Sequence, residues 1–307
     1  MWIGLACALA AGLMWGLVFV APLMLPEYPA PLLTVGRYLA FGLIALPLAL
    51  MDLRGLRQLR RADWLEAARL SIVGNFIYFL CLAGAIQRAG GPLPTVIIGT
   101  LPVVIAVCSN FGAGALPWRQ LAPALGLMLL GIACVNQVEL ASLDAAQLPR
   151  YLSGAALAFV ALGCWTWYPI RNAAWLRSRR DFNPRAWATA QGLVTLPMAA
   201  VGLAVFAAVA DFHPVLGPRP GAFVGLMLAV GLLASWLGTL CWNTASQRLP
   251  TGLLGQLIVF ETLSALVYAW LLRGAWPAPL TLAGAALLIG GVLLGLRAYR
   301  ASGAPGG

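Results

Sequence analysis

Two charged side chains, Glu261 and Arg37, stand inside apolar stretches where an ionised group is costly. Glu261 is the only acidic residue well inside such a stretch, and Arg37 is the only clearly embedded basic residue. Charges at that depth usually mark the path of a solute or an ion. Either group can bind the ammonium or the carboxylate of a zwitterion, and Glu261 can alternatively carry a coupling proton. The structural alternatives are that Glu261 caps a backbone break or pairs with a neighbour, and that Arg37 snorkels to the surface.

Polar residues at helical spacing mark two further faces. One face carries Ser71, Asn75, Tyr78 and Leu82, and the other carries Ser235, Thr239, Trp242 and Asn243. Because Asn75 and Ser235 correspond within an internal repeat described below, we expect the two faces to look at each other and to bind substrate. The alternative is that Ser and Asn only join helices through hydrogen bonds.

Aromatic residues lie deep inside the apolar stretches. Trp15 and Trp165 stand about 13 residues into theirs, which is too deep for the belt of Trp at a membrane surface. With further aromatic residues they predict the lining of a cavity for a flat or amphipathic solute, against the alternative of ordinary packing. These further residues are Tyr78, Trp167, Tyr168, Trp242 and Tyr268.

Proline and glycine mark candidate hinges for gating. Pro102 and Pro169 remove a backbone donor and weaken the preceding helical turn, while Gly99 and Gly238 let backbones approach closely. Static kinks are the alternative.

Motifs for metal, cofactor or catalysis are missing from the sequence. The six cysteines fall inside apolar runs without CxxC spacing, and there is one histidine, His213. Walker, HExxH and GxSxG patterns are absent. We therefore expect no catalytic residue, no metal and no cofactor, and a protein that is not an enzyme. A single embedded acid and no embedded histidine also make a poor proton relay, which favours facilitated transport.

Ten apolar segments position these residues. The chain is 62% hydrophobic and 9% charged, whereas about a quarter of the residues in a soluble domain are charged. Long apolar runs without alternation favour transmembrane helices over a barrel. We therefore predict an all-α membrane protein whose ten spans are roughly 2–21, 32–51, 67–86, 92–111, 120–138, 151–171, 185–209, 221–246, 251–272 and 279–298.

All 19 basic residues are arginines, and all of them except the embedded Arg37 cluster between or at the ends of these segments, where they set the orientation. This placement argues against a nucleic-acid surface. With a cytoplasmic N-terminus, four arginines face outward: Arg88, Arg150, Arg219 and Arg273. Fourteen then face the cytoplasm: Arg54, Arg57, Arg60, Arg61, Arg69, Arg119, Arg171, Arg177, Arg179, Arg180, Arg185, Arg248, Arg297 and Arg300. We therefore expect a multi-pass membrane protein with both termini in the cytoplasm.

The two halves of the chain repeat each other. Residues 4–15 and 154–165 agree at five of twelve positions with an offset of 150. Ala85, Gln87 and Arg88 return as Ala245, Gln247 and Arg248 with an offset of 160. Leu127 and Gly131 return as Leu287 and Gly291. This predicts five-helix units at 1–138 and 151–298, followed by a cytoplasmic tail at 299–307. Because five is odd, the second unit enters the membrane upside down.

Several segments resemble the drug/metabolite transporter superfamily with its paired EamA-type units. TVGRYLAFGLIAL at 34–46 and GTLPVVIAVCSNF at 99–111 resemble the second and fourth helices of a unit, and 258–277 resembles the fourth helix of the second unit. In that helix Thr262 replaces an expected proline, and Arg273 stands where many members have an acidic residue. Within the superfamily the chain is most similar to bacterial aromatic amino-acid exporters of the YddG type.

This resemblance implies a secondary transporter of the bacterial inner membrane that exports aromatic and other amphipathic amino acids, or similar metabolites, by alternating access around a central aromatic-lined cavity. A lipid flippase or a broad drug and metabolite exporter is the alternative, and a membrane-embedded enzyme would need more clustered titratable groups. The expected partners are the small-molecule substrate and membrane lipids, with no nucleic acid. We expect a monomer.

Overall fold

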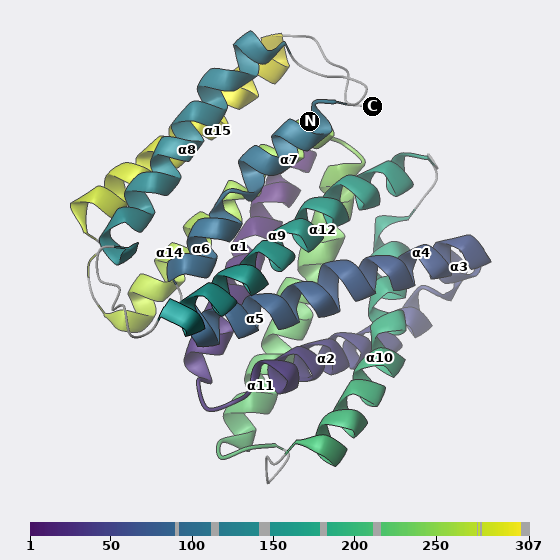
Figure 1. Ribbon diagram of the computed structural model, residues 1–307. Helices are drawn as coiled ribbons and strands as arrows, with labels where there is room; N and C mark the ends of the chain where they lie inside the picture. Colours follow the sequence, from purple (N-terminus) through teal and green to yellow (C-terminus); the bar gives the residue numbers. More distant parts are fainter. Residues whose placement is uncertain are drawn as a thin grey trace.

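The computed structural model describes residues 1–89, 92–111, 117–140, 148–178, 183–210, 216–274, 276 and 278–301. All regular secondary structure in these ranges is helical. Eight of the described helices are long and apolar enough to cross a membrane. The chain is therefore an all-α, multi-pass membrane protein, and its helices form a bundle with α8 and α15 side by side at one edge (Figure 1).

The helices follow the predicted segments in order. In the first half they are α1 (Trp2–Met24), α2 (Ala30–Met51), α3 (Leu53–Arg57), α4 (Arg61–Ser71), the π-helix η1 (Ile72–Ile77), α5 (Tyr78–Ala89), α6 (Pro92–Gly99), α7 (Leu101–Ser109) and α8 (Trp118–Leu140). In the second half they are α9 (Leu148–Arg177), α10 (Pro184–Val209), α11 (Pro220–Val230), the π-helix η3 (Gly231–Leu237), α12 (Gly238–Ser246), α13 (Thr251–Leu257), α14 (Val259–Arg273) and α15 (Pro279–Ala301).

Two of the ten predicted segments are not among these candidate spans. Segment 92–111 is broken at Thr100 into α6 and α7, because Pro102, in the first turn of α7, cannot donate a backbone hydrogen bond to the previous turn. The apolar part of α8 is short, at Trp118–Cys134. The other eight segments are the candidate spans.

The third segment begins earlier than predicted, at Arg61 instead of residue 67. The carboxylate of Asp63 accepts a hydrogen bond of 2.6 Å from the backbone N–H of Arg60 and so caps this helix. The charged side chains Asp63, Glu66 and Arg69 lower the hydropathy of these turns, which hid them from a search for apolar runs.

Irregular backbone recurs at matching places in the two halves. The π-helices η1 and η3 begin 159 residues apart and end 160 residues apart. The break at Thr100 corresponds to a second break at Ile258, between α13 and α14. Each half thus interrupts its third and fourth segments at equivalent positions, which the apolar pattern did not predict.

Glycine contacts between equivalent helices are reciprocal. A Cβ atom on Gly131 of α8 would lie 2.7 Å from the Gly284 carbonyl oxygen of α15, and one on Gly291 of α15 would lie 2.8 Å from the Ala124 carbonyl oxygen of α8. At an offset of 160, each contact maps onto the other. The numbering runs in opposite directions along the two helices, so they pack antiparallel.

Helices α2 and α10 repeat this arrangement. Gly42 of α2 faces Leu196 of α10, while Gly192 of α10 faces Phe41 and Ala45 of α2. Gly42 and Gly192 are themselves related by the repeat offset of 150. Because glycine has no side chain, the backbones within each helix pair, α2 with α10 and α8 with α15, can approach closely.

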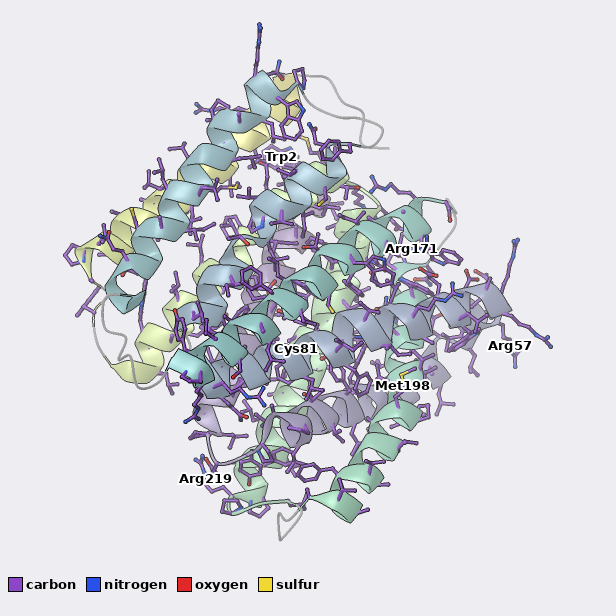
Figure 2. The ribbon with its side chains drawn as sticks, in the orientation of Figure 1. Trp2, Arg57, Cys81, Arg171, Met198 and Arg219 are labelled. Atoms are coloured by element: carbon purple, nitrogen blue, oxygen red, sulfur yellow. The ribbon has the colours of Figure 1, made fainter. Side chains whose placement is uncertain are left out.

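The two ends of the bundle differ in charge. Helix α1 begins and α15 ends at the same end (Figure 1). At that end Asn183 donates a hydrogen bond to Asp52, just before the arginines of α3 and α4. Figure 2 shows Arg57 projecting here and Arg219 at the opposite end. We call these the arginine-rich end and the Arg219 end.

Candidate functional site

A small cavity lies in the interior of the bundle, between helices of both halves. Residues from α1, α2, η1 and α5 meet residues from α9, η3, α12 and α14 around it: Trp15, Val18, Arg37, Gly74, Asn75, Tyr78, Trp165, Ala234, Ser235, Thr239 and Glu261. The space inside holds about one water molecule. The side chains thus close on one another in this conformation.

Arg37 reaches the cavity from α2 and is only 5% exposed. Its Nε donates a hydrogen bond of 3.0 Å to the Ser235 hydroxyl oxygen in η3. The guanidinium carbon lies 5.1 Å from the ring centre of Tyr38 and 4.6 Å from that of Phe79. This side chain therefore points into the bundle, where two aromatic rings stabilise its charge. It does not snorkel to the surface.

Glu261 enters the same cavity from the first turn of α14 and is 2% exposed. Tyr78 donates its hydroxyl to Oε1 at 3.4 Å, and the Trp165 indole N–H donates to Oε2 at 3.3 Å. Because the break at Ile258 starts a new helix here, the carboxylate also lies at the positive end of a helix dipole. The backbone break and the carboxylate that lines the cavity thus occur together.

Aromatic rings form one wall of the cavity. The Trp165 ring stacks between those of Tyr78 and Tyr168, with centroid distances of 4.6 and 4.9 Å. Trp15 meets Trp165 edge to face at 5.1 Å. The indole N–H of Trp15 donates a 2.8 Å hydrogen bond to the Ala234 carbonyl oxygen in η3. A π-helix shifts its backbone pairing by one residue, and such turns are frequent at functional sites.

Three predicted site residues stand behind the cavity wall. Trp242 packs against Trp15 at 5.1 Å, and Tyr168 donates to the Gln191 side-chain oxygen at 2.9 Å. Asn243 accepts a hydrogen bond of 2.8 Å from Asn172. They support the lining residues from outside the cavity.

Two aromatic residues in the predicted lining face elsewhere. Trp167 is 38% exposed and points outward from α9, so its place in the lining was wrong. The Tyr268 hydroxyl donates to the Leu13 carbonyl oxygen at an exposed position. Both side chains lie off the inward face of their helix. Aromatic content alone does not reveal which face of a helix points inward.

The candidate hinges have different surroundings. Gly99 ends α6 immediately before the break at Thr100, and Pro102 lies in the first turn of α7. Pro169, in contrast, lies within the unbroken helix α9. Gly238 follows η3, and a Cβ there would lie 2.7 Å from the Trp15 indole nitrogen. Of these positions, only Gly99 and Pro102 flank a break in a helix.

Three lining residues were missed by the sequence analysis, namely Val18, Gly74 and Ala234. Gly74 and Ala234 precede Asn75 and Ser235 and are themselves related by the offset of 160. The repeat therefore contained the signal for this pair, although their side chains carry no polar group. Val18 lies one helical turn beyond Trp15.

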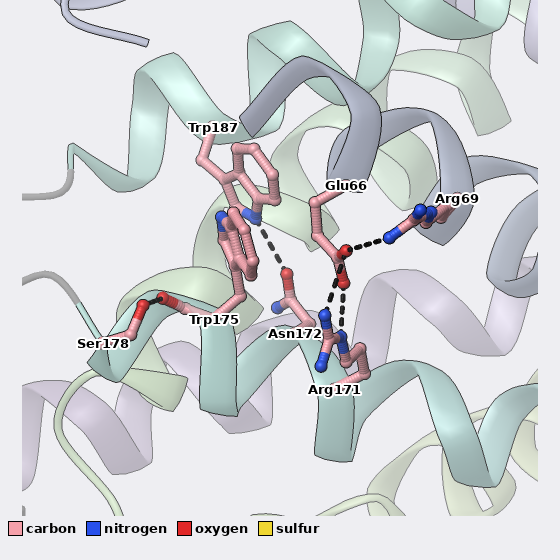
Figure 3. Close-up of polar contacts among 7 residues, drawn as sticks. All are labelled: Glu66, Arg69, Arg171, Asn172, Trp175, Ser178 and Trp187. Atoms are coloured by element: carbon pink, nitrogen blue, oxygen red, sulfur yellow. Dashed lines mark hydrogen bonds and ion pairs between the residues drawn. The ribbon is translucent and has the colours of Figure 1, made fainter. Parts of the chain in front are cut away.

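The arginine-rich end is joined by a polar network (Figure 3). Arg171 of α9 donates to both carboxylate oxygens of Glu66 in α4, at 2.5 and 3.2 Å. The Trp187 indole N–H donates to the Asn172 side-chain oxygen at 2.8 Å. Close by in the chain, Arg177 donates to the Thr251 hydroxyl of α13. These contacts tie the end of α9 to three other helices.

The Arg219 end is joined in a similar way. Arg219 donates to Glu27, and its backbone N–H donates to the Tyr28 hydroxyl at 2.9 Å. Gln87 donates a 2.7 Å hydrogen bond to the Tyr28 carbonyl oxygen and accepts one of 3.0 Å from the Ala30 N–H. A more open hollow beside this network is lined by Pro22, Leu23, Pro26, Glu27, Tyr28, Pro29, Ile86, Gln87 and Arg150.

Comparisons with known proteins agree with this architecture. The model of the EamA-like transporter family matches residues 2–137. The inner membrane protein YtfF of Escherichia coli (strain K12) is 53% identical over 305 residues, which cover 96% of this chain and 95% of that protein. A crystal structure shares the fold with a TM-score of 0.75 at 19% identity, covering 97% of this chain and 98% of the other. The chain belongs to the EamA-like transporter family within the drug/metabolite transporter superfamily.

Proposed function

We propose that this protein is a secondary transporter that exports aromatic and other amphipathic amino acids, or similar small metabolites, across the inner membrane. The observation that carries the proposal is the composition of the central cavity. The first half contributes Trp15, Arg37, Asn75 and Tyr78, and the second contributes Trp165, Ser235, Thr239 and Glu261. Opposite charges and aromatic rings together suit a solute that has both polar and apolar parts.

The proposal includes ten spans arranged as two inverted repeats, 1–138 and 151–298. The antiparallel packing of α2 with α10 and of α8 with α15 supports it. A two-fold axis that relates antiparallel neighbours must run perpendicular to the helices, and so in the membrane plane. The broken helices at matching positions support the same relation. A family match over 2–137 has the length of one such unit.

Alternating access follows from this symmetry. The link between Glu27 and Arg219 joins the end of the first segment to the third segment of the other half. The ion pair between Arg171 and Glu66 joins the end of the first segment of the second half to the third segment of the first half. Here the basic residue is on the first segment and the acidic residue is on the third. Opening one link at a time would connect the closed cavity to one side of the membrane and then to the other.

The arginine bias supports cytoplasmic termini, and the printed location of the E. coli relative supports the inner membrane. Reporter fusions at both ends test this orientation. Activity of a periplasm-dependent reporter at the C-terminus would overturn the orientation, and if the N-terminus were cytoplasmic at the same time it would also overturn the inverted repeat.

A lipid flippase remains the second candidate, because a bundle with broken helices can open sideways to lipid. The deciding experiment uses liposomes that contain only this protein. We expect saturable movement of labelled phenylalanine or tryptophan without movement of fluorescent lipid between leaflets. Failure across a broad amino-acid panel, together with lipid scrambling, would reverse the order of the two candidates.

A further inference from the structure

The guanidinium group of Arg37 has a buried N–H donor without a hydrogen-bond partner among the described residues. Its Nη1 is buried and has no hydrogen-bond partner among the described residues, although Nε is bound to Ser235. A buried, charged donor left unpaired costs free energy, and such groups in native proteins are commonly completed by a ligand, an ion or a water. The guanidinium is held in place by one hydrogen bond and two aromatic rings, so its free edge is already oriented.

Glu261 provides the opposite charge on the same cavity. Both of its oxygens accept hydrogen bonds from neutral donors, at 3.3 and 3.4 Å, which are longer than a charge-assisted bond. No hydrogen bond joins Arg37 to Glu261, although the two side chains line one cavity. The site therefore holds two separated charges of opposite sign beside the rings of Trp15 and Trp165.

We propose that Arg37 binds the carboxylate of the substrate and Glu261 binds its ammonium group, so that the cavity selects zwitterionic α-amino acids. This inference rests on the proposed function. A guanidinium binds a carboxylate through two parallel N–H donors, and the Ser235 hydroxyl lies beside it. When substrate binds, the ammonium group takes the place of the neutral donors Tyr78 and Trp165 as the hydrogen-bond partner of the Glu261 carboxylate. The aromatic wall then receives the side chain of the amino acid.

The test measures binding of three ligands that differ only in charged groups: phenylalanine, phenylalaninamide and 3-phenylpropionate. Apparent Kd values come from the ligand-dependent shift in the thermal unfolding of the purified protein. We expect phenylalanine to bind most tightly. Arg37→Gln should weaken phenylalanine by about tenfold or more while leaving phenylalaninamide within about twofold. Glu261→Gln should likewise remove the advantage of phenylalanine over 3-phenylpropionate.

Control variants separate recognition from folding. Arg88→Gln, at an exposed position near the end of α5, should leave all three affinities unchanged. If Arg37→Gln does not fold, Ser235→Ala keeps the guanidinium but removes its anchoring hydroxyl, and it should weaken phenylalanine more than phenylalaninamide. Equal weakening of all three ligands by the Arg37 or Ser235 variants would overturn the assignment, as would a wild-type protein that binds none of them.

Flux in liposomes distinguishes this inference from the function on which it rests. If phenylalanine flux is the same in the Arg37 and Glu261 variants as in the unchanged protein, the proposed transport function is kept and the assignment of the two charged residues is rejected. Binding that depends on Arg37 and on the carboxylate, without flux, would keep the assignment and reject the transporter.

Discussion

The charged and aromatic side chains of the cavity were largely visible in the sequence. Glu261 and Arg37 are conspicuous because ionised groups are rare in apolar segments, and Trp15 and Trp165 repeat at one offset. Their mutual distances could not be predicted, because they depend on how α2, α9 and α14 cross. To exclude Trp167 from the lining, one must also know which face of α9 points inward to within one residue. Trp167 is 38% exposed.

Loss of the central indole should impair transport. Trp165→Ala removes the ring between Tyr78 and Tyr168 and the N–H that donates to Glu261. We expect initial phenylalanine flux in liposomes to fall by about tenfold, from loss of two ring contacts and one hydrogen bond to Glu261. Trp276→Ala is the matched control, because Trp276 is 95% exposed and should tolerate the change. Equal losses in folded preparations of both variants would mean that Trp165 only fills space.

Helix interruptions were the least predictable elements. Pro102 indicated a weak point, yet the break lies at Thr100, and the corresponding break at Ile258 has no proline in its first turn. The π-helices η1 and η3 are mostly apolar with one polar residue each, Asn75 and Ser235, and their residue types do not predict a π-helix. Their irregular backbone depends on tertiary contacts, such as the hydrogen bond from Trp15 to the Ala234 carbonyl oxygen, and such contacts connect residues far apart in the chain.

Adjacent glycines on α15 should differ in their effect on stability. At Gly291 a Cβ atom would lie 2.7 Å from Met128 and 2.8 Å from the Ala124 carbonyl oxygen, whereas at Gly290 nothing lies within 4 Å. We expect Gly291→Ala to lower the free energy of unfolding by about 1–3 kcal/mol through overpacking. Gly290→Ala should leave it unchanged or raise it slightly. Thermal unfolding in one detergent measures both. The reverse order would contradict the close contact between α8 and α15.

The two end links should control access from opposite sides. A cysteine-free variant carrying Val18→Cys places one thiol in the cavity, where an impermeant thiol reagent reports opening. Glu27→Gln should raise labelling from the Arg219 end by about two- to fivefold, as expected for a partly exposed ion pair. Glu66→Gln should raise it from the arginine-rich end. Arg69→Gln is the control, because that arginine is mostly exposed and lies 3.7 Å from Glu66. If Glu27→Gln and Glu66→Gln both raised labelling from the same end of the bundle, the two ion pairs could not be separate gates.

The link at the Arg219 end should persist at physiological pH. The hydrogen bond from Arg219 holds the pKa of Glu27 below its ordinary value. A carboxyl whose pKa is lowered in the folded state stabilises that state above its unfolded pKa, and the effect is lost as the pH falls through the lowered pKa. The ratio of labelling in Glu27→Gln to labelling in the unchanged protein, which cancels the ionisation of the reporter thiol, should therefore be flat between about pH 5 and 8. A change of this ratio within that range would show that another titrating group controls the gate.

The whole molecule combines features that the sequence predicts well with one that it does not. Composition, the arginine bias and the repeat between residues 4–15 and 154–165 predict an all-α membrane protein built from two related halves. They do not predict the size of the central cavity, which depends on the conformational state. In this closed state it holds about one water molecule, so a solute requires the halves to move apart.

The central claim is that a solute occupies the cavity between the two halves. The most direct measurement is the position of bromine in crystals of the protein grown together with 4-bromophenylalanine, read from anomalous scattering. The account predicts a peak beside the rings of Trp15 and Trp165, and electron density that places the carboxylate at Arg37 and the ammonium group at Glu261. A ligand bound only at the lipid-facing surface or in the hollow beside Tyr28 and Gln87, in a protein that transports it, would contradict the account.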